Sequence, residues 1–299
     1  MTTLVTLGLA ELIARTQVPA ASFDLLYEAH PDPELGVTLA ANADFEFEGV
    51  TTKLAPTRIR TTAEGYREPA VLLPAPPGTR RLACLGDSVV FGWGVEALET
   101  FCAHLPQRLG PGWDAVNFGV PGYNLTQTVR RFELNGSRFH PDAVVLIVNQ
   151  NDADPPLSAS RSRWSRAADS SALLRWVLVR LTRSAAAETP TAATPVAPAD
   201  VPSPGYVAPL TRLAGLYSRT GTPWIVVFTW PAPAALVRHT VRLGAEVLDA
   251  RDILATPHYT IAGDGHPNAA GHAALADRIA ERLGVLIARQ RGPARSHER

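Results

Sequence analysis

The stretch Asp142-Ala-Val-Val-Leu-Ile-Val-Asn149 decides the fold of this chain. Its six central residues are all apolar, so a strand built from them would be hydrophobic on both faces. Successive side chains of a strand point to opposite faces, and strands that are apolar on both faces belong to parallel sheets covered on both sides. The stretch therefore predicts a buried parallel strand over residues 142–149.

Similar apolar runs lie on either side of this strand. They predict four further strands, at residues 81–86, 113–119, 222–230 and 245–249. Helical spacing of apolar residues predicts helices at 100–109, 125–139, 171–182, 207–219, 234–243 and 268–289. Alternating strands and helices are typical of an α/β fold, in which helices cover both faces of a parallel sheet. We place this main domain at residues 79–291.

The segments outside this alternation have a different composition. Residues 1–78 contain Pro-rich turns and one alternating stretch at 44–48, and we expect an N-terminal extension packed on the main domain. Residues 184–205 are rich in Ala, Pro and Thr, which predicts a flexible surface loop, and residues 292–299 form a tail. The first residues are apolar but interrupted by Glu11 and Arg15. They favour an amphipathic helix packed on the domain, with a trimmed remnant of a membrane anchor as the alternative.

The composition restricts the partners and the compartment. The chain has 28 basic and 28 acidic residues, so it lacks the positive surplus that nucleic-acid binding needs. There is no clear signal peptide and no clear membrane span, which would need about 20 apolar residues. We expect a cytoplasmic location by default, and an extracytoplasmic one if the N-terminus is a trimmed anchor. Cys84 and Cys102 lack the spacing of a metal site. A buried thiol is expected at Cys84, with a disulfide between the two as the alternative.

Polar residues follow three of the expected strands, where ligands bind in open parallel sheets. Ser88 follows the first strand, Gly122 the second and Asn151 the third. Ser88 could be a nucleophile whose proton is taken by His266, while Asp264 orients the imidazole. The backbone N–H groups of Ser88 and Gly122, with the side-chain amide of Asn151, would then form an oxyanion hole.

Each of these residues also has an ordinary structural explanation. Gly-Asp-Ser is a common turn, Gly122 could end a strand, and Asn151 could cap a helix. Asn268 could cap the last helix, and His272 is expected to be structural. The combination favours chemistry because every piece lies at the end of a strand or directly before a helix.

The order Gly86-Asp87-Ser88, Gly122, Asn151, His266 resembles that of the SGNH (GDSL-type) hydrolases, in their bacterial esterase/acetyltransferase branch. The resemblance covers roughly residues 80–285. It implies a three-layer α/β/α fold with a flavodoxin-like parallel sheet, here of five strands. It also implies that Ser88 is the nucleophile, His266 the base, and Gly122 and Asn151 the oxyanion donors.

Two positions depart from the pattern of that family. Asn149 stands where the family usually has glycine, so its side chain would add bulk or a hydrogen-bonding group near the site. The usual acid lies three residues before the histidine, a position held here by Gly263. Asp264, two residues before, resembles the arrangement in SGNH-type polysaccharide acetyltransferases. Asp249 and Asp252 are the alternative acids.

Together these residues predict a serine-dependent carboxylic-ester hydrolase with an acyl-serine intermediate. We expect it to act on a small-molecule or carbohydrate ester such as an O-acetyl group, without a metal or another cofactor. An O-acyltransferase is the alternative, and a non-catalytic carbohydrate-binding protein is a second alternative that the intact Ser88/His266 pair argues against. Trp93, Phe91 and Tyr123 could stack on a sugar ring, although we expect them at wall and core positions.

Overall fold

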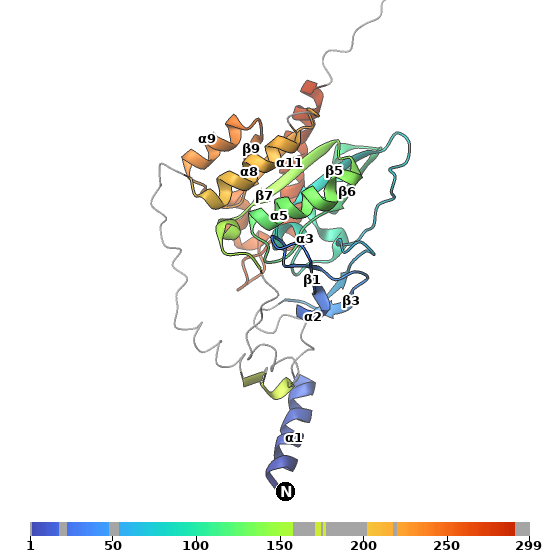
Figure 1. Ribbon diagram of the computed structural model, residues 1–299, viewed down its shortest axis with the longest axis vertical. Coiled ribbons are helices and arrows are strands. Elements are labelled where there is room, and N and C mark those ends of the chain that lie inside the picture. Colours follow the sequence, from blue (N-terminus) through green and yellow to red (C-terminus); the bar gives the residue numbers. More distant parts are fainter. Residues whose placement is uncertain are drawn as a thin grey trace, which may run out of the picture.

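The computed structural model describes residues 2–17, 23–47, 54–157, 171–174, 176–177, 202–217 and 220–290 (Figure 1). Its central sheet consists of β5 (Arg80–Leu85), β6 (Trp113–Asn117), β7 (Ala143–Val148), β8 (Trp224–Phe228) and β9 (Glu246–Asp249). The strands are parallel and lie in the order β6-β5-β7-β8-β9. This is the flavodoxin-like order, in which the winding of the chain reverses between the strands β5 and β7. The five expected strands are confirmed, with ends that differ by one or two residues.

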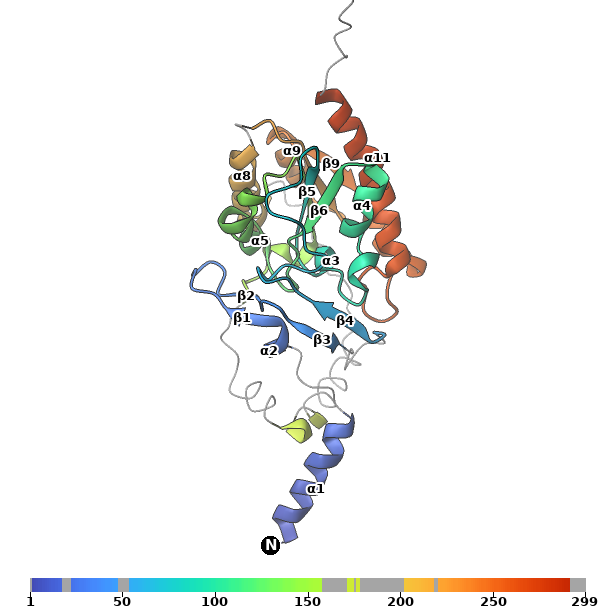
Figure 2. The same cartoon turned by 90° about the vertical axis from the view of Figure 1, so that its right-hand side faces the viewer.

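Helices cover both faces of the sheet, as Figure 2 shows. One face packs against α5 (Leu125–Arg131), α8 (Pro204–Tyr217) and α9 (Ala234–Arg242). The other packs against α4 (Phe101–Leu109), α10 (Arg251–Ala255) and α11 (Ala269–Gln290). Short elements complete the layers: α3 (Ser88–Phe91), η1 (Ala97–Glu99), η4 (Gln150–Ala153) and η5 (Pro257–Tyr259). The three-layer α/β/α fold is therefore confirmed.

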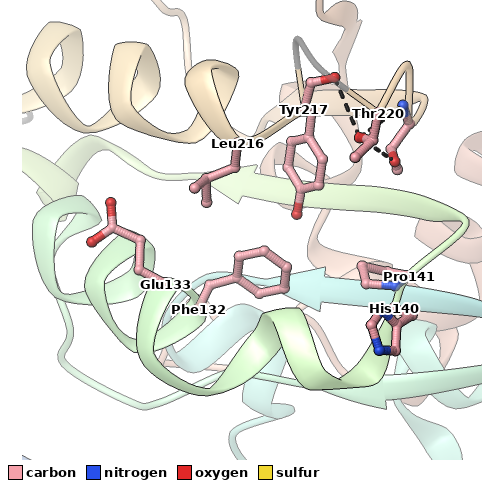
Figure 3. Close-up of a pocket in the computed structure, with 8 residues that line it drawn as sticks. Phe132, Glu133, His140, Pro141, Leu216, Tyr217 and Thr220 are labelled. Atoms are coloured by element: carbon pink, nitrogen blue, oxygen red, sulfur yellow. Dashed lines mark hydrogen bonds between the residues drawn. The ribbon is translucent and has the colours of Figure 1, made fainter.

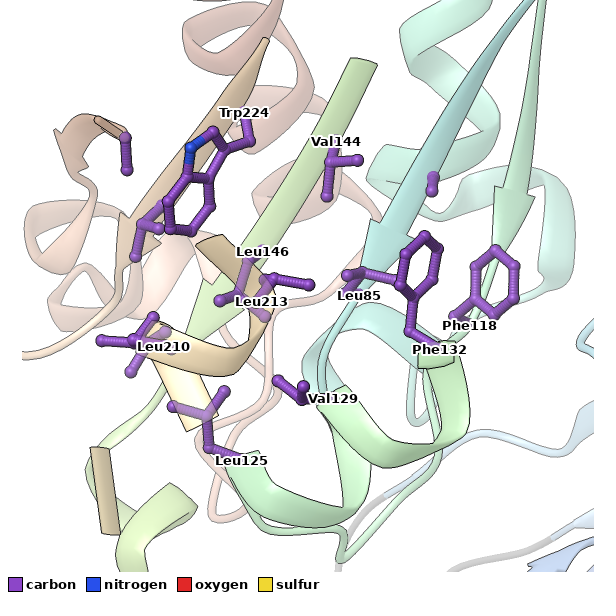
Figure 4. Close-up of a cluster of buried hydrophobic side chains, with 14 of the residues drawn as sticks. Leu85, Phe118, Leu125, Val129, Phe132, Val144, Leu146, Leu210, Leu213 and Trp224 are labelled. Carbon is purple, nitrogen blue, oxygen red and sulfur yellow. The ribbon is translucent and has the colours of Figure 1, made fainter. Parts of the chain in front are cut away.

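Strand β7 joins the two cores, as its uninterrupted apolar run predicts. Val144 and Leu146 lie in the core beneath α5 and α8 (Figure 4), whereas Val145 and Ile147 lie in the core beneath α4 and α11. All four side chains are fully buried. Burying each such side chain contributes about 1.5–3 kcal/mol, so the position of β7 at the centre of the sheet is strongly favoured.

The two cysteines lie in the second of these cores. Cys84 belongs to β5 and Cys102 to α4, and both are buried and free. Burial, together with the neighbouring Cys102 thiol, raises the pKa of Cys84 well above its ordinary value. The buried thiol expected at Cys84 is confirmed, and the alternative disulfide is not formed.

The expected helix over residues 125–139 is regular only in its first half. After α5 the chain widens into a π turn, η2 (Phe132–Gly136), followed by a 3-10 turn, η3 (Ser137–Phe139). The ring of Phe132 lies so close to Gly136 that an added Cβ would come within 2.1 Å of it. Because Phe132 is buried beside Tyr217 of α8, packing between helices outweighs the local helical pattern here.

Several expected features lie partly outside the described residues. Of the helix expected at 171–182, residues 172–174 and 176–177 are described and helical. The loop expected at 184–205 is described only from residue 202, and α8 begins at Pro204. The tail at 292–299 lies outside the described residues altogether.

The N-terminal extension contains two antiparallel strand pairs. The pair β1 (Tyr27–Ala29) and β2 (Val37–Leu39) follows α2 (Phe23–Leu26), and β3 (Asp44–Phe47) pairs with β4 (Thr57–Arg60). These strands lie near α3, at the carboxyl end of the central sheet (Figure 2). Gln127 Nε2 donates to Leu35 O at 2.7 Å, and the Tyr27 hydroxyl donates to Pro121 O at 2.8 Å. The strand expected at 44–48 is present, while the division of the chain at residue 78 remains a prediction.

Helix α1 (Thr2–Gln17) differs from the expectation. Its apolar side chains Val5, Leu9 and Leu12 are exposed, and the helix points away from the strands of the extension (Figures 1 and 2). Its carboxylate Glu11 accepts hydrogen bonds from Ser171 Oγ and from the N–H groups at 172 and 173. A polar contact thus replaces the apolar packing that we expected. Within the described residues, no helix combines the length and the hydropathy needed to cross a bilayer.

Candidate active site

Ser88 lies at the carboxyl end of β5, where the order of the sheet reverses. The chain leaves the strand through Gly86, where an added Cβ would lie 2.5 Å from a methyl carbon of Val90. Helix α3 then begins at Ser88, and the Asp87 side chain caps it by accepting from Val89 N at 3.1 Å. This tight strand–turn–helix passage places a half-buried serine hydroxyl at the edge where parallel sheets bind ligands.

His266 reaches Ser88 from the loop that precedes α11. The distance from His266 Nε2 to Ser88 Oγ is 2.8 Å. On the other side of the ring, His266 Nδ1 is hydrogen-bonded to Asp264 Oδ1, which also accepts from His266 N at 3.2 Å. A carboxylate on Nδ1 selects the tautomer that leaves Nε2 free to accept a proton. The arrangement can therefore transfer the proton of the Ser88 hydroxyl to the imidazole.

The Asp264 side chain is only 9% exposed. Burial raises its pKa, but the hydrogen bond from His266 and the positive charge on that ring lower it more, so the net pKa lies below its ordinary value. Asp264 is therefore ionised at neutral pH and can stabilise an imidazolium. Asp249 and Asp252, the alternative acids, instead form ion pairs with neighbouring arginines.

Gly122 lies in a turn and Asn151 in η4, and both residues are exposed at the same end of the sheet as Ser88. Gly122 has φ +78°, a left-handed conformation that favours glycine. Its turn is tied to the Ser88 loop because Val120 N donates to Gly86 O at 3.2 Å. Asn151 Nδ2 lies 3.4 Å from Asp87 Oδ2, next to the residue that precedes Ser88. The structure thus brings all of the sequence-predicted residues to one end of the sheet.

Asp87 and Asn149 form a buried hydrogen-bond network beside Ser88, in which Asn149 supplies the hydrogen-bonding group expected at this position while its partners could not be predicted. Asn149 Nδ2 donates to Asp87 Oδ1 at 2.7 Å, and Asn149 Oδ1 accepts from the Thr229 hydroxyl. The Asn149 N–H donates to Asp152 Oδ2 at 2.8 Å. Asn149, which stands where the family usually has glycine, therefore connects the ends of β7 and β8 to Asp87, the residue before Ser88. Its only signal in the sequence was the departure itself.

The two buried carboxyl groups of this network have raised pKa values. Burial raises the pKa of Asp87, and burial together with the charge of Asp87 raises the pKa of Asp152 well above its ordinary value. Neighbouring carboxyl groups favour ionisation of only one of them. Asp87 has more donors, from Val89 N and the amides of Asn149 and Asn151. Asp87 is therefore the better site for the negative charge.

His272 is structural, as expected. It is fully buried, its Nδ1 accepts from Phe101 N at 3.2 Å, and its ring stacks on that of Phe101. Burial lowers the pKa of His272 to about 3, so its imidazole is neutral at physiological pH. Asn268 caps α11 by accepting from Gly271 N at 2.9 Å. Both residues fix the start of the helix that follows the His266 loop.

A cavity of about 400 Å³ lies at the opposite end of the sheet (Figure 3). Its walls include Phe132, Leu216 and Tyr217, together with His140 and Pro141 from the turn before β7. These residues lie near the amino ends of β7 and β8, whereas Ser88 lies at the carboxyl end of β5. The cavity is therefore separate from the candidate active site.

The strand order and the grouping of Ser88, His266 and Asp264 define a class: flavodoxin-like α/β proteins that carry the residues of a serine hydrolase where the sheet order reverses. The sequence model of the GDSL-like lipase/acylhydrolase family matches residues 84–274, well over half of the chain. The chain belongs to this family, which confirms the resemblance noted in the sequence. A search of curated proteins found no match.

Solved structures of esterases match this chain at low sequence identity. The psychrotrophic esterase EstA from Pseudoalteromonas sp. is 12% identical with a TM-score of 0.42, and the match covers 72% of this chain and 100% of EstA. Axe2, an acetylxylan esterase from Geobacillus stearothermophilus, is 17% identical with a TM-score of 0.43, covering 69% and 95%. A two-domain esterase active on acetylated mannans is 16% identical with a TM-score of 0.45, covering 70% and 50%. These matches carry no information on the reaction or the substrate of this chain.

Proposed function

We propose that this protein is a serine-dependent carboxylic-ester hydrolase that acts on small acyl esters such as O-acetyl groups. The observation that carries the proposal is the 2.8 Å distance between Ser88 Oγ and His266 Nε2, with Asp264 on the far side of the imidazole. A serine hydroxyl is a weak nucleophile until a base takes its proton, and this contact provides the base. Membership of an acylhydrolase family supports the same chemistry.

In the proposed reaction, Ser88 Oγ attacks the carbonyl carbon of the ester while its proton moves to His266 Nε2. The N–H groups of Ser88 and Gly122 and the amide of Asn151 stabilise the oxyanion that forms. The imidazolium then donates its proton to the alcohol oxygen as the C–O bond breaks, leaving an acyl-serine. A water molecule then attacks the acyl carbonyl carbon while its proton passes to His266 Nε2. The carboxylic acid is released as its bond to Ser88 Oγ breaks, and the imidazolium returns the proton to that oxygen.

The exposure of the two proposed oxyanion donors favours water as the acceptor. Gly122 and Asn151 are both exposed, so water can reach this side of the site. An O-acyltransferase would use the same catalytic residues but must keep water away from the acyl-serine.

The proposal is tested by measuring hydrolysis of 4-nitrophenyl acetate by the purified full chain. Ser88→Ala and His266→Ala should each lower kcat by about a thousandfold or more, because each removes a member of the proton-transfer pair. Ser203→Ala, which changes a serine at the start of α8, is the matched control and should retain the wild-type rate. A Ser88→Ala variant with wild-type activity would overturn the proposal.

The same protein distinguishes the hydrolase from the transferase. With an acetyl donor and a mixture of free sugars, the hydrolase releases only acetate and leaves the sugars unmodified in a mass spectrum. Acetylated sugar that depends on Ser88 would instead establish the acyltransferase. Sugar binding without any Ser88-dependent turnover would establish the non-catalytic alternative.

A further inference from the structure

Two aromatic side chains from different parts of the chain meet beside His266. Trp93 follows α3, and its ring centroid lies 6.5 Å from that of His266. Phe47, at the end of β3 in the N-terminal extension, lies 4.5 Å from Trp93 between ring centroids. Both side chains are only partly buried, whereas Phe91 and Tyr123 are fully buried core residues. Of the three aromatic residues considered in the sequence, only Trp93 therefore offers surface to a ligand.

The loop that carries Trp93 is held by a buried arginine of the extension. Arg67 is 1% exposed, and its guanidinium donates to the carbonyl groups of Phe91, Gly92 and Val95 at 3.1, 3.0 and 2.8 Å. These three carbonyl groups lie on both sides of Trp93. Such a multiple hydrogen bond fixes the loop, so the tryptophan ring is held in place before a ligand arrives.

The extension also contacts the loop of His266. An added Cβ at Gly94 would lie 2.5 Å from a methyl carbon of Leu54 and 2.6 Å from one of Ile261. Leu54 precedes β4 of the extension, and Ile261 N donates to His266 O at 2.8 Å. The extension, the Trp93 loop and the His266 loop therefore pack directly against one another. The aromatic pair has a fixed position relative to the base.

The role of His266 as a proton donor indicates which part of the substrate lies beside the aromatic pair. His266 Nε2 donates its proton to the alcohol oxygen as the ester breaks, so the alcohol part of the ester must lie on the His266 side of Ser88. The acyl part lies toward the opposite, oxyanion side, where Leu157 approaches Gly122. The aromatic pair thus stands where the alcohol part of the substrate would leave.

We propose that Phe47 and Trp93 form a subsite for the alcohol part of the ester, and that it takes a ring with one flat apolar face, namely the pyranose of an O-acetylated sugar. The inference rests on the proposed esterase function. The two rings are partly exposed and inclined at 53° to each other, so together they can contact one face of a ligand while its other face stays in water. A pyranose matches this arrangement because its C–H face is apolar and its hydroxyl groups stay solvated around the rim.

The test compares kcat/KM for an acetylated methyl pyranoside with kcat/KM for ethyl acetate, whose alcohol is too small to cover the rings. Phe47→Leu and Trp93→Leu keep apolar volume but remove the flat rings, and each should lower the pyranoside-to-ethyl ratio by about fivefold to tenfold. Phe47→Tyr keeps the aromatic ring and should retain the wild-type pyranoside-to-ethyl ratio. Glu46→Ala changes the exposed neighbour of Phe47 in β3 and should leave both rates unchanged.

The possible outcomes distinguish a failure of the proposed subsite from a failure of the proposed esterase function. An unchanged ratio in both leucine variants would overturn the subsite, even where Ser88-dependent hydrolysis of ethyl acetate upholds the esterase. A preference for hexyl acetate over the pyranoside, lost in the same variants, would overturn the pyranose and assign an alkyl alcohol instead. If no ester is hydrolysed in a Ser88-dependent manner, the proposed function itself is wrong.

Discussion

The two loops that bring Ser88 and His266 together are held in different ways. The Ser88 loop follows β5, which is buried from Arg81 onward, and is tied through Asp87 and Asn149 to the ends of two further strands. The His266 loop is held by local contacts, such as Asp264 to the ring and Ile261 N to His266 O, and by the packing of Ile261 against the loop around Trp93. The sheet therefore positions the nucleophile, whereas a surface turn positions the base. Changes in the turn should reduce activity without unfolding the protein.

The largest effect is expected from Asp264→Asn in the His266 loop. The low pKa of Asp264 keeps this carboxyl ionised at neutral pH, and the amide would remove the charge that stabilises the imidazolium. We expect kcat for 4-nitrophenyl acetate to fall by about 1,000- to 10,000-fold, with an unchanged thermal unfolding midpoint. Asp252→Asn, which alters an exposed ion pair with Arg278, is the control and should keep full activity. Equal losses in both variants would contradict the role of Asp264.

A smaller effect is expected on the nucleophile side. Asn151→Ala removes one proposed oxyanion donor and should lower kcat by about 100- to 1,000-fold. Gln150→Ala alters the exposed neighbouring side chain in η4 and should leave kcat unchanged. Steady-state kinetics on both variants measure the difference. If Asn151→Ala keeps the wild-type kcat, the oxyanion donor must be sought elsewhere.

The smallest effect concerns the pH dependence of stability at the base of the His266 loop. Burial lowers the pKa of His272 to about 3, against about 6.5 for an ordinary histidine. Between these pH values the unfolded chain binds a proton that the folded chain does not, so the free energy of unfolding falls as the pH is lowered. Well below pH 6.5, His272 alone should lower the free energy of unfolding by about 1.4 kcal/mol for each pH unit of acidification.

His272→Asn keeps an acceptor for Phe101 N but cannot titrate, so its free energy of unfolding should depend less on pH. Urea unfolding at pH 7, 6 and 5 measures the slope for the wild type and the variant. His258→Asn, at an exposed histidine in η5, is the control and should keep the wild-type slope. Equal slopes in the wild type and in His272→Asn would show that His272 does not carry this dependence.

The parts of the fold that were predictable are those with a strong local signal. Strand β7 is apolar on both faces, so its burial follows from its own residues. The early end of α5 depends on Phe132 packing against α8, a contact made by distant parts of the chain. The exposed apolar residues of α1 likewise reflect which neighbours the helix contacts. Sequence periodicity carries no information about such neighbours.

The same limit applies to the candidate site. Ser88, Gly122, Asn151 and His266 could be located because each lies in a short motif at the end of a strand or before a helix. The bond between Asn149 and Thr229 depends on how β7 and β8 align, and that alignment is set by the whole sheet. The contact of Phe47 with Trp93 depends on how the extension folds back, for which the chain has no local signal.

The contacts of Arg67 determine where this chain can be cut and joined to a related one in a chimera. Its three hydrogen bonds to the loop around Trp93 cross the boundary at residue 78 that composition suggests. A chimera joined at that boundary would inherit the sheet with Ser88 but lose the donor for three buried carbonyl groups. A fragment that retains this active site must therefore begin before Arg67. A chimera between relatives should keep Arg67 together with the loop around Trp93.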